Sequence, residues 1–264
     1  MEREVLELAK ILLLTISAPI KPGALHRLRV DSLYEEVLQE ALHVIAYMEE
    51  AYRRGVEVSQ GSRVAASLGL GRIVGDSLRS SFEDLERRPL IGLHVAPITL
   101  ASILGYTRGE EGVTYTRVNR GVKTLLYGSR PEDVLDLISG MEATSLGEEL
   151  RYLDSQGITR NTVMLRAMSL GDIYEVLERV DTGFMLTLRG LRRLRDMVGR
   201  VDKRSQIRAI VSSYLELLGS FKDIKINGID PRTLVRYDRE LSHRSDELNR
   251  LLGGTFLLAT LSMG

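Results

Sequence analysis

Three cationic side chains gather in one short segment near the start of the chain. The stretch Ser17-Ala-Pro-Ile-Lys-Pro-Gly-Ala-Leu-His-Arg27 places Lys21, His26 and Arg27 within seven residues. Pro and Gly favour a turn, Lys and Arg bind phosphate oxygens, and His exchanges protons near neutral pH. The segment therefore fits a phosphate-binding loop, and it also fits an ordinary connection between helices with solvated charges.

Other polar residues indicate less. His43, His94 and His243 are too scattered, with His26, to form a metal-binding pattern. The segment 189–208 holds eight basic residues, but it lacks the interleaved aromatic residues that stack on bases, so it fits a solvated helix face and we do not expect a nucleic-acid partner. The glycines of 69–75 resemble a dinucleotide loop, but they follow helical rather than strand sequence, so we expect them to allow close helix packing.

Composition excludes several classes of protein. The chain has 264 residues, 44% of them hydrophobic, with 36 basic and 36 acidic residues, which fits a folded globular domain rather than a disordered chain. It contains no cysteine, so disulfides, thiolate nucleophiles and cysteine-ligated metals are excluded. The acidic start lacks the features of a cleaved signal, and no apolar stretch reaches the ~20 residues of a membrane span. We therefore expect a soluble, cytoplasmic protein.

The elements that must position these side chains are helices, because apolar residues recur at intervals of three and four along most of the sequence. The pattern predicts an all-α fold: a single compact domain, residues 1–264, of roughly ten helices. A segment at 221–229 fits a loop or a short strand, and glycine-containing loops are expected at 106–112 and 146–159. Ser129 and Pro131 form a helix start signal. The predicted helices cover residues 2–16, 32–54, 62–80, 92–105, 115–127, 129–143, 160–179, 183–198, 203–219, 231–252 and 255–264.

Several segments carry a resemblance to one known family. Lys21-Pro-Gly-Ala-Leu-His-Arg27 is similar to the KPGNVHR element of the triphosphoribosyl-dephospho-CoA synthase family, especially its archaeal-type members. Leu68-Gly-Leu-Gly-Arg-Ile73 resembles the family's GLGE-I segment, and Ile91-Gly-Leu-His94 stands where the family has NTH or NTN. Gly183-Phe184 resembles a shorter signature, and Gly253-Gly-Thr255-Phe-Leu-Leu-Ala-Thr-Leu261 resembles the terminal GTTADL-type helix. The order is kept over the whole chain.

The resemblance implies an all-helical transferase that joins the ribose of ATP to dephospho-CoA, with release of adenine. Such a glycosyl transfer passes through an oxocarbenium-like transition state. The implied ligands are ATP and dephospho-CoA or a related nucleotide, and the implied cofactor is Mg²⁺, with no metal ligand identified. The implied catalytic residues are His26 and His94, the phosphate-binding residues are Lys21, Gly23 and Arg27, and the substrate-binding residues are Gly254 and Thr255.

The sequence departs from the family pattern at polar positions. Ala24 replaces the Asn of KPGNVHR, Arg72 replaces the Glu after Gly-Leu-Gly, and Leu257 replaces the terminal Asp. Gly92-Leu93 replaces the Asn-Thr before His. Loss of a base or metal-binding carboxylate costs roughly 10²- to 10⁴-fold in rate, so the transferase activity is expected to be lost or altered unless Asp76, Glu83 or Asp84 compensates. Asp76 lies one helical turn from Arg72 and is equally suited to pair with it.

Two functions of different classes therefore remain open. One is a divergent triphosphoribosyl transferase. The other is a non-catalytic paralogue that binds a nucleotide or CoA-like ligand or acts as a scaffold, and that buries its apolar C-terminal helix in a homo-oligomer. The sequence does not distinguish the two.

Overall fold

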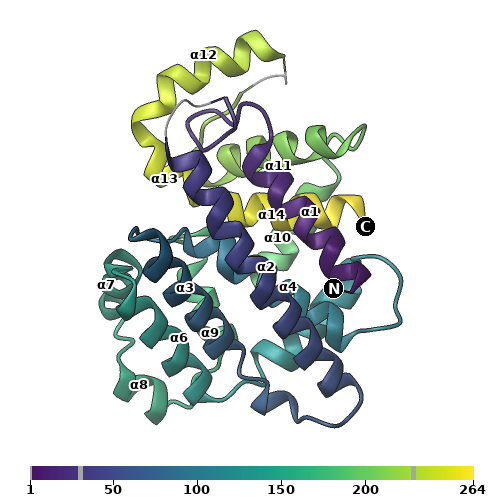
Figure 1. Cartoon of the computed structure of the whole chain (residues 1–264), viewed down its shortest axis with the longest axis vertical. Helices are drawn as coiled ribbons and strands as arrows, with labels where there is room; N and C mark the ends of the chain where they lie inside the picture. Colours follow the sequence, from purple (N-terminus) through teal and green to yellow (C-terminus); the bar gives the residue numbers. More distant parts are fainter. Residues whose placement is uncertain (1, 29–31, 227–229) are drawn as a thin grey trace.

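The chain folds into helices packed around two buried central helices (Figure 1). The structure, a computed structural model, describes residues 2–28, 32–226 and 230–264, and it contains no β-strand in these ranges. The all-α prediction is confirmed. The helices are α1 (Arg3–Ser17), α2 (Ser32–Ser59), α3 (Leu70–Leu85), α4 (Ile91–Tyr106), α5 (Tyr115–Gly121), α6 (Pro131–Ala143), α7 (Gly147–Ser155), α8 (Arg160–Leu165), α9 (Leu170–Leu177), α10 (Leu188–Val198), α11 (Gln206–Lys222), α12 (Pro231–Leu241), α13 (Ser245–Asn249) and α14 (Leu252–Met263). Short helical turns lie at Ala65–Ser67, Thr182–Phe184 and Ser242–Arg244.

The central helices are α4 and α14. Both are apolar on every face, and a helix of that kind must be covered on all sides. The long helix α2 packs along α4, while α14 contacts α1, α4, α10 and α11. Contact between the first and the last helix joins both ends of the chain in one core, as the single-domain prediction requires. Among the described residues, no helix combines the length and the apolarity that crossing a bilayer requires.

Glycines allow the closest helix contacts, as the sequence predicts for the segment 69–75. A side chain on Gly71 would collide with the carbonyl oxygen of Asp133, and Gly75 faces Gly140, so α3 and α6 approach backbone to backbone. The same arrangement brings α2 close to α4, where Gly105 lies against the backbone of Tyr52. These glycines therefore allow the close packing of neighbouring helices.

Four predicted helix boundaries are wrong because local turns interrupt the apolar pattern. Gly69 is left-handed (φ 72°), so the expected helix 62–80 begins only at Leu70. Ala167 is also left-handed (φ 49°), and Ser169 forms a new capping box, so 160–179 is two helices, α8 and α9. Ser129 does not cap α6, because its hydroxyl donates to Leu126 and accepts from the N–H of Leu170. The expected helix 183–198 begins at Leu188, where Thr187 is the cap.

Further differences concern the loops. The expected loop 146–159 contains α7, and the expected helix 231–252 divides into α12, a short turn and α13. The helix expected over 115–127 is α5 followed by a π-helical turn, Val122–Leu126. Residues 223–226 of the expected loop or strand belong to no helix or strand, and 227–229 lie outside the described residues. In the part of the chain that the structure describes, these breaks give more helices than the roughly ten expected.

Candidate functional site

A charged cavity of about 380 Å³ lies where the N-terminal end of α4 meets α7 and the segment from α13 to α14. Small-molecule sites typically measure roughly 300–1,000 Å³, so the cavity has room for one small ligand. Part of its wall is apolar, from Leu33, Leu90 and Ile91. The polar part consists of three arginines, four carboxylates and one amide: Arg87, Arg88, Arg250, Glu148, Glu149, Asp181, Asp246 and Asn249.

The arginines come from two short segments that backbone interactions hold in place. α3 ends at Leu85, the C-cap residue Glu86 is left-handed (φ 50°), and Arg87 and Arg88 follow before α4 begins. Arg250 follows α13, and its carbonyl oxygen accepts hydrogen bonds from N (3.1 Å) and Oγ1 (2.8 Å) of Thr182. Segments from opposite halves of the sequence therefore present guanidinium groups to one cavity.

Carboxylates on α7 pair with two of these guanidinium groups. Arg88 Nη2 donates to both Oε1 and Oε2 of Glu149, each at 2.7 Å. Arg250 forms a two-bond fork with Glu148, in which Nη1 donates to Oε1 at 2.8 Å and Nη2 donates to Oε2. Arg250 Nη2 also lies 3.9 Å from Glu149 Oε1. An anionic ligand would therefore have to compete with these carboxylates for the arginines.

Asp181 supplies a group in the cavity wall that can hold or release a proton. Its side chain is 4% exposed, and Oδ1 accepts a hydrogen bond from the N–H of Gly183 at 2.7 Å. Burial raises the pKa of Asp181 to about 7, and the nearby charge of Glu149 adds to this, while the Gly183 hydrogen bond and Arg250 oppose it. At neutral pH both protonation states of Asp181 are populated, as general acid–base chemistry requires.

His94 lies beneath the cavity and does not line it. It is fully buried, with Nδ1 2.8 Å from Ser77 Oγ and Nε2 2.8 Å from Glu40 Oε1. Glu40 also accepts from the N–H of Leu90 at 2.7 Å and from Arg87. Burial raises the pKa of Glu40, but the opposing effect of His94 and Arg87 is larger, so the pKa lies below its ordinary value of 4.5. The buried serine of this Ser–His–carboxylate group is closed to substrate, so the group ties α2, α3 and α4 together.

Lys21 is also buried, contrary to what a phosphate-binding side chain requires. Its exposed fraction is 0%, and Nζ donates to the carbonyl oxygens of Ile16 and Ala18, each at 3.3 Å. Burial lowers the pKa of Lys21 to about 7. The ammonium group therefore caps the C-terminal end of α1, where carbonyl groups lack helical partners.

The rest of the predicted loop is held against α12 by polar contacts. Gly23 is left-handed (φ 77°), and its N–H donates to Asp238 Oδ1 at 2.8 Å. His26 is 3% exposed; its Nε2 lies 3.1 Å from Asp238 Oδ2, and its Nδ1 accepts from the N–H of Leu28 at 3.2 Å. The Arg27 side chain is exposed. None of the cationic residues predicted to bind phosphate lines the cavity.

Four of the five segments that carry the family resemblance nevertheless meet beside the cavity, while the segment 68–73 lies at the contact of α3 with α6. The N–H of Leu25, inside the predicted loop, donates to Oδ1 of the cavity residue Asn249 at 2.7 Å. Gly92, Gly183 and Gly253 pack so closely that a side chain on Gly253 would collide with the backbones of the other two. Three of the five similar segments therefore meet at one point, and the segment of Leu25 reaches the cavity through Asn249.

The predicted substrate-binding pair forms part of this packing. Gly254 N–H donates to Thr182 Oγ1 at 3.1 Å, and Thr255 Oγ1 donates to the carbonyl oxygen of Leu251 at 2.7 Å. Both residues are buried in α14, and neither lines the cavity.

Sequence reasoning missed the residues that do line the cavity. Arg87 and Arg88 stand four and three residues before Ile91, where the segment that resembles NTH begins, and Asp181 stands two residues before Gly183-Phe184. Arg250 stands two residues before the start of α14 and three residues before Gly253. Proximity to the similar segments was therefore the available signal. Among the cations of the predicted loop, Lys21 and His26 are buried, and Arg27 is exposed but does not line the cavity.

The positions that depart from the family pattern lie away from solvent or away from the cavity. Arg72 is exposed and lies 3.6 Å from Asp76, so the ion-pair interpretation of Asp76 is confirmed. Asp84 Oδ2 lies 3.1 Å from His43 Nε2 on the outer face of α2 and α3. Neither acid lines the cavity, nor does Glu83. The remaining replaced positions are buried: Ala24, Gly92, Leu93 and Leu257.

The implied magnesium ion does not fit the residues present. Within the part of the chain that the structure describes, no three His, Asp or Glu side chains are arranged to hold a metal ion. In the cavity, Glu148 and Glu149 are already engaged by Arg250 and Arg88. Mg²⁺ prefers carboxylates free to bind it, so we derive no catalytic step through a metal.

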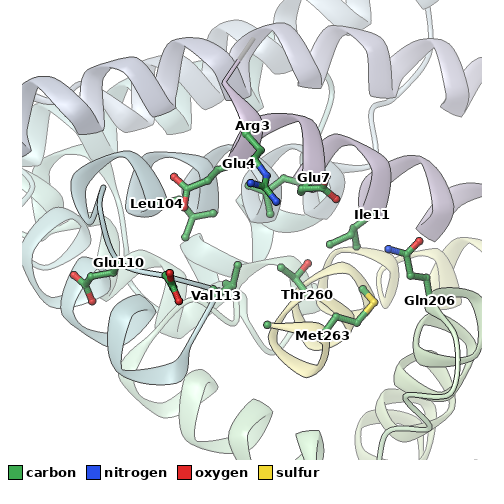
Figure 2. A pocket seen from close by; sticks show the side chains of 14 residues that line it. Arg3, Glu4, Glu7, Ile11, Leu104, Glu110, Val113, Gln206, Thr260 and Met263 are labelled. Atoms are coloured by element: carbon green, nitrogen blue, oxygen red, sulfur yellow. The ribbon is translucent and has the colours of Figure 1, made fainter.

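A second cavity, of about 600 Å³, lies between α1, α14 and the loop after α4. Figure 2 shows Glu4 and Glu7 of α1 on one side of it and Thr260 and Met263 of α14 on the other. Glu4 is engaged by Arg117, at 2.7 Å, and by the hydroxyl of Tyr52. This cavity is lined by none of the site residues that were predicted from the family resemblance.

The basic segment 189–208 is balanced by acidic side chains. Arg189 and Arg193 both pair with the buried Glu178, and Arg204 and Arg208 pair with Asp202. These carboxylates lower the positive potential that would attract a nucleic acid.

Comparison of the chain with family models, curated proteins and solved structures gives no match. The cavity and the resemblance of the short segments are therefore the features that bear on function.

Proposed function

We propose that the cavity binds one phosphate-bearing nucleotide or CoA-like ligand. The observation that carries this proposal is that four of the five segments similar to the triphosphoribosyl-dephospho-CoA synthase family meet beside a cavity that contains three arginines. Guanidinium groups bind phosphate through pairs of parallel hydrogen bonds. The apolar wall from Leu33, Leu90 and Ile91 provides a surface for the rest of such a ligand.

We further propose that the protein binds this ligand without transferring a triphosphoribosyl group. A cavity of about 380 Å³ has room for one nucleotide-sized group rather than for ATP and dephospho-CoA side by side. The acids of the family pattern are replaced at Arg72 and Leu257, and no metal site accompanies the cavity within the described residues. The transferase reaction is therefore the second candidate, favoured by the presence in the cavity wall of Asp181, whose ionised form can accept a proton from a hydroxyl group.

Ligand-induced thermal stabilisation tests the proposal. At a ligand concentration 100-fold above Kd, binding stabilises the fold by about 2.7 kcal/mol, which corresponds to a rise in Tm of roughly 5–10 °C for a chain of this size. We expect such a rise with ATP or dephospho-CoA for the wild type. Arg88→Gln should reduce it, while the control Arg160→Gln, an exposed arginine paired with Glu142 outside the cavity, should not.

A turnover assay separates the two candidates. The protein is incubated with ATP, Mg²⁺ and dephospho-CoA, and released adenine is measured. We expect none at high protein concentration; adenine release that Asp181→Asn abolishes would establish the transferase instead. If neither ligand raises Tm, the binding proposal is refuted.

A further inference from the structure

Arg250 has the features of a preformed anion-binding group. Its backbone is held by two hydrogen bonds from Thr182, and its side chain is only 16% exposed, so the guanidinium group has a fixed place in the cavity wall. Its two terminal nitrogens donate a pair of hydrogen bonds to the two oxygens of one carboxylate, an arrangement that also suits a phosphate. Few conformations are lost when an anion binds to such a group.

The anion that Arg250 holds in the structure is the side chain of Glu148. Glu148 is in the first turn of α7, and its side chain is 51% exposed. The hydrogen bonds from Arg250 hold the pKa of Glu148 below its ordinary value of 4.5, so the carboxylate is ionised at neutral pH. An exposed ion pair of this kind is weak, because water screens the attraction and the long side chains lose freedom.

The neighbouring pair is built differently. Glu149 is 1% exposed and takes both its hydrogen bonds from Arg88, so release of this carboxylate would leave it buried without a partner. Exchange of a carboxylate for a ligand is therefore far easier at Arg250 than at Arg88.

We propose that Glu148 occupies the place of a ligand's phosphate group on Arg250, and that a phosphate-bearing ligand binds by displacing it. The inference rests on the proposed function and names its anionic contact. A phosphate dianion presents the same pair of oxygens as the carboxylate but carries more charge, so it competes successfully with Glu148. The site selects phosphate monoesters and polyphosphates over monovalent carboxylates, which bring no charge beyond that of Glu148 itself.

The consequence is a variant that binds better than the wild type. Glu148→Gln removes the competing charge and leaves Arg250 in place, so the affinity for inorganic phosphate and for pyrophosphate should rise by roughly threefold to fivefold. Because Glu148 is exposed, the substitution should leave Tm without ligand nearly unchanged. Arg250→Gln should remove measurable binding of both probes, and Arg250→Lys, which keeps the charge but not the fork, should weaken it.

Isothermal titration with inorganic phosphate and pyrophosphate, with acetate as the monovalent comparison, tests the inference. The matched control is Glu142→Gln, an exposed glutamate paired with Arg160 outside the cavity, which should bind like the wild type. Unchanged affinity in Glu148→Gln, with binding lost in Arg250→Gln, would overturn the competition while leaving the proposed function intact. Absence of binding of phosphate, pyrophosphate, ATP and dephospho-CoA in the wild type and in Glu148→Gln would refute both the inference and the proposed function. Binding that survives in Arg250→Gln would refute the assignment of Arg250.

Discussion

The buried ammonium group of Lys21 makes the stability of the fold depend on pH. Burial lowers the pKa of Lys21 from 10.5 to about 7, so between these values the unfolded chain binds a proton that the folded chain does not. The free energy of unfolding therefore rises as the pH rises through this range. Each pKa unit corresponds to about 1.4 kcal/mol, which gives roughly 5 kcal/mol over the whole window.

This value is an upper limit, because the ammonium group also donates to the carbonyl oxygens of Ile16 and Ala18, and these bonds favour the charged form. Lys21→Met removes the titrating group but keeps most of the buried volume. Urea unfolding of both proteins at pH 7, 8, 9 and 10 measures the effect, since the other titrating groups contribute equally to both. From pH 7 to pH 10, the free energy of unfolding should rise by about 2–5 kcal/mol more in the wild type than in Lys21→Met.

The control is Lys10→Met, since Lys10 is exposed and paired with Glu7. Its stability should run parallel to that of the wild type across the same pH range. Parallel curves for Lys21→Met and the wild type would refute the reasoning, because they would show that Lys21 keeps an ordinary pKa in the folded state. If the stability of the wild type relative to Lys21→Met rose as the pH fell, the sign of the effect would be contradicted.

Three further predictions concern packing, the buried ion pair and the cavity. Gly71→Ala, which forces a methyl group against the carbonyl of α6, should lower the free energy of unfolding by about 1–3 kcal/mol in urea, whereas Gly199→Ala, with open space around it, should not. Glu40→Gln leaves Arg87 without its buried partner and should cost about 3–5 kcal/mol in the same assay; a loss below about 1 kcal/mol would contradict this role. Burial raises the pKa of Asp181 to about 7, so this carboxyl group loses its negative charge as the pH falls from 8 to 6. After correction for the titration of the ligand itself, pyrophosphate should therefore bind up to about tenfold more tightly at pH 6 than at pH 8. Calorimetry of Asp181→Asn should show no such difference.

The helical class and much of the helix content could be predicted from the sequence because apolar periodicity is a local property. The segments 91–106 and 252–263 are apolar on every face, which already requires that they be covered by other helices. The glycines of 69–75 could likewise be assigned to helix packing. The helix boundaries were harder to predict, because the breaks at Gly69 and Ala167 depend on left-handed residues that interrupt an otherwise continuous apolar pattern.

The site was only partly predictable, because a sequence motif does not reveal whether its side chains face solvent. Lys21, His26 and His94 have suitable chemistry, but each is buried against a helix end or a carboxylate. Ion pairs such as those of Arg88 and Arg250 join residues far apart in the chain, and they form only when α7 is packed between them. The sequence by itself determined which helices must be covered and where short segments resemble a known family. Only the tertiary structure decided which charges share a cavity, because burial and pairing arise from packing between segments that no local pattern connects.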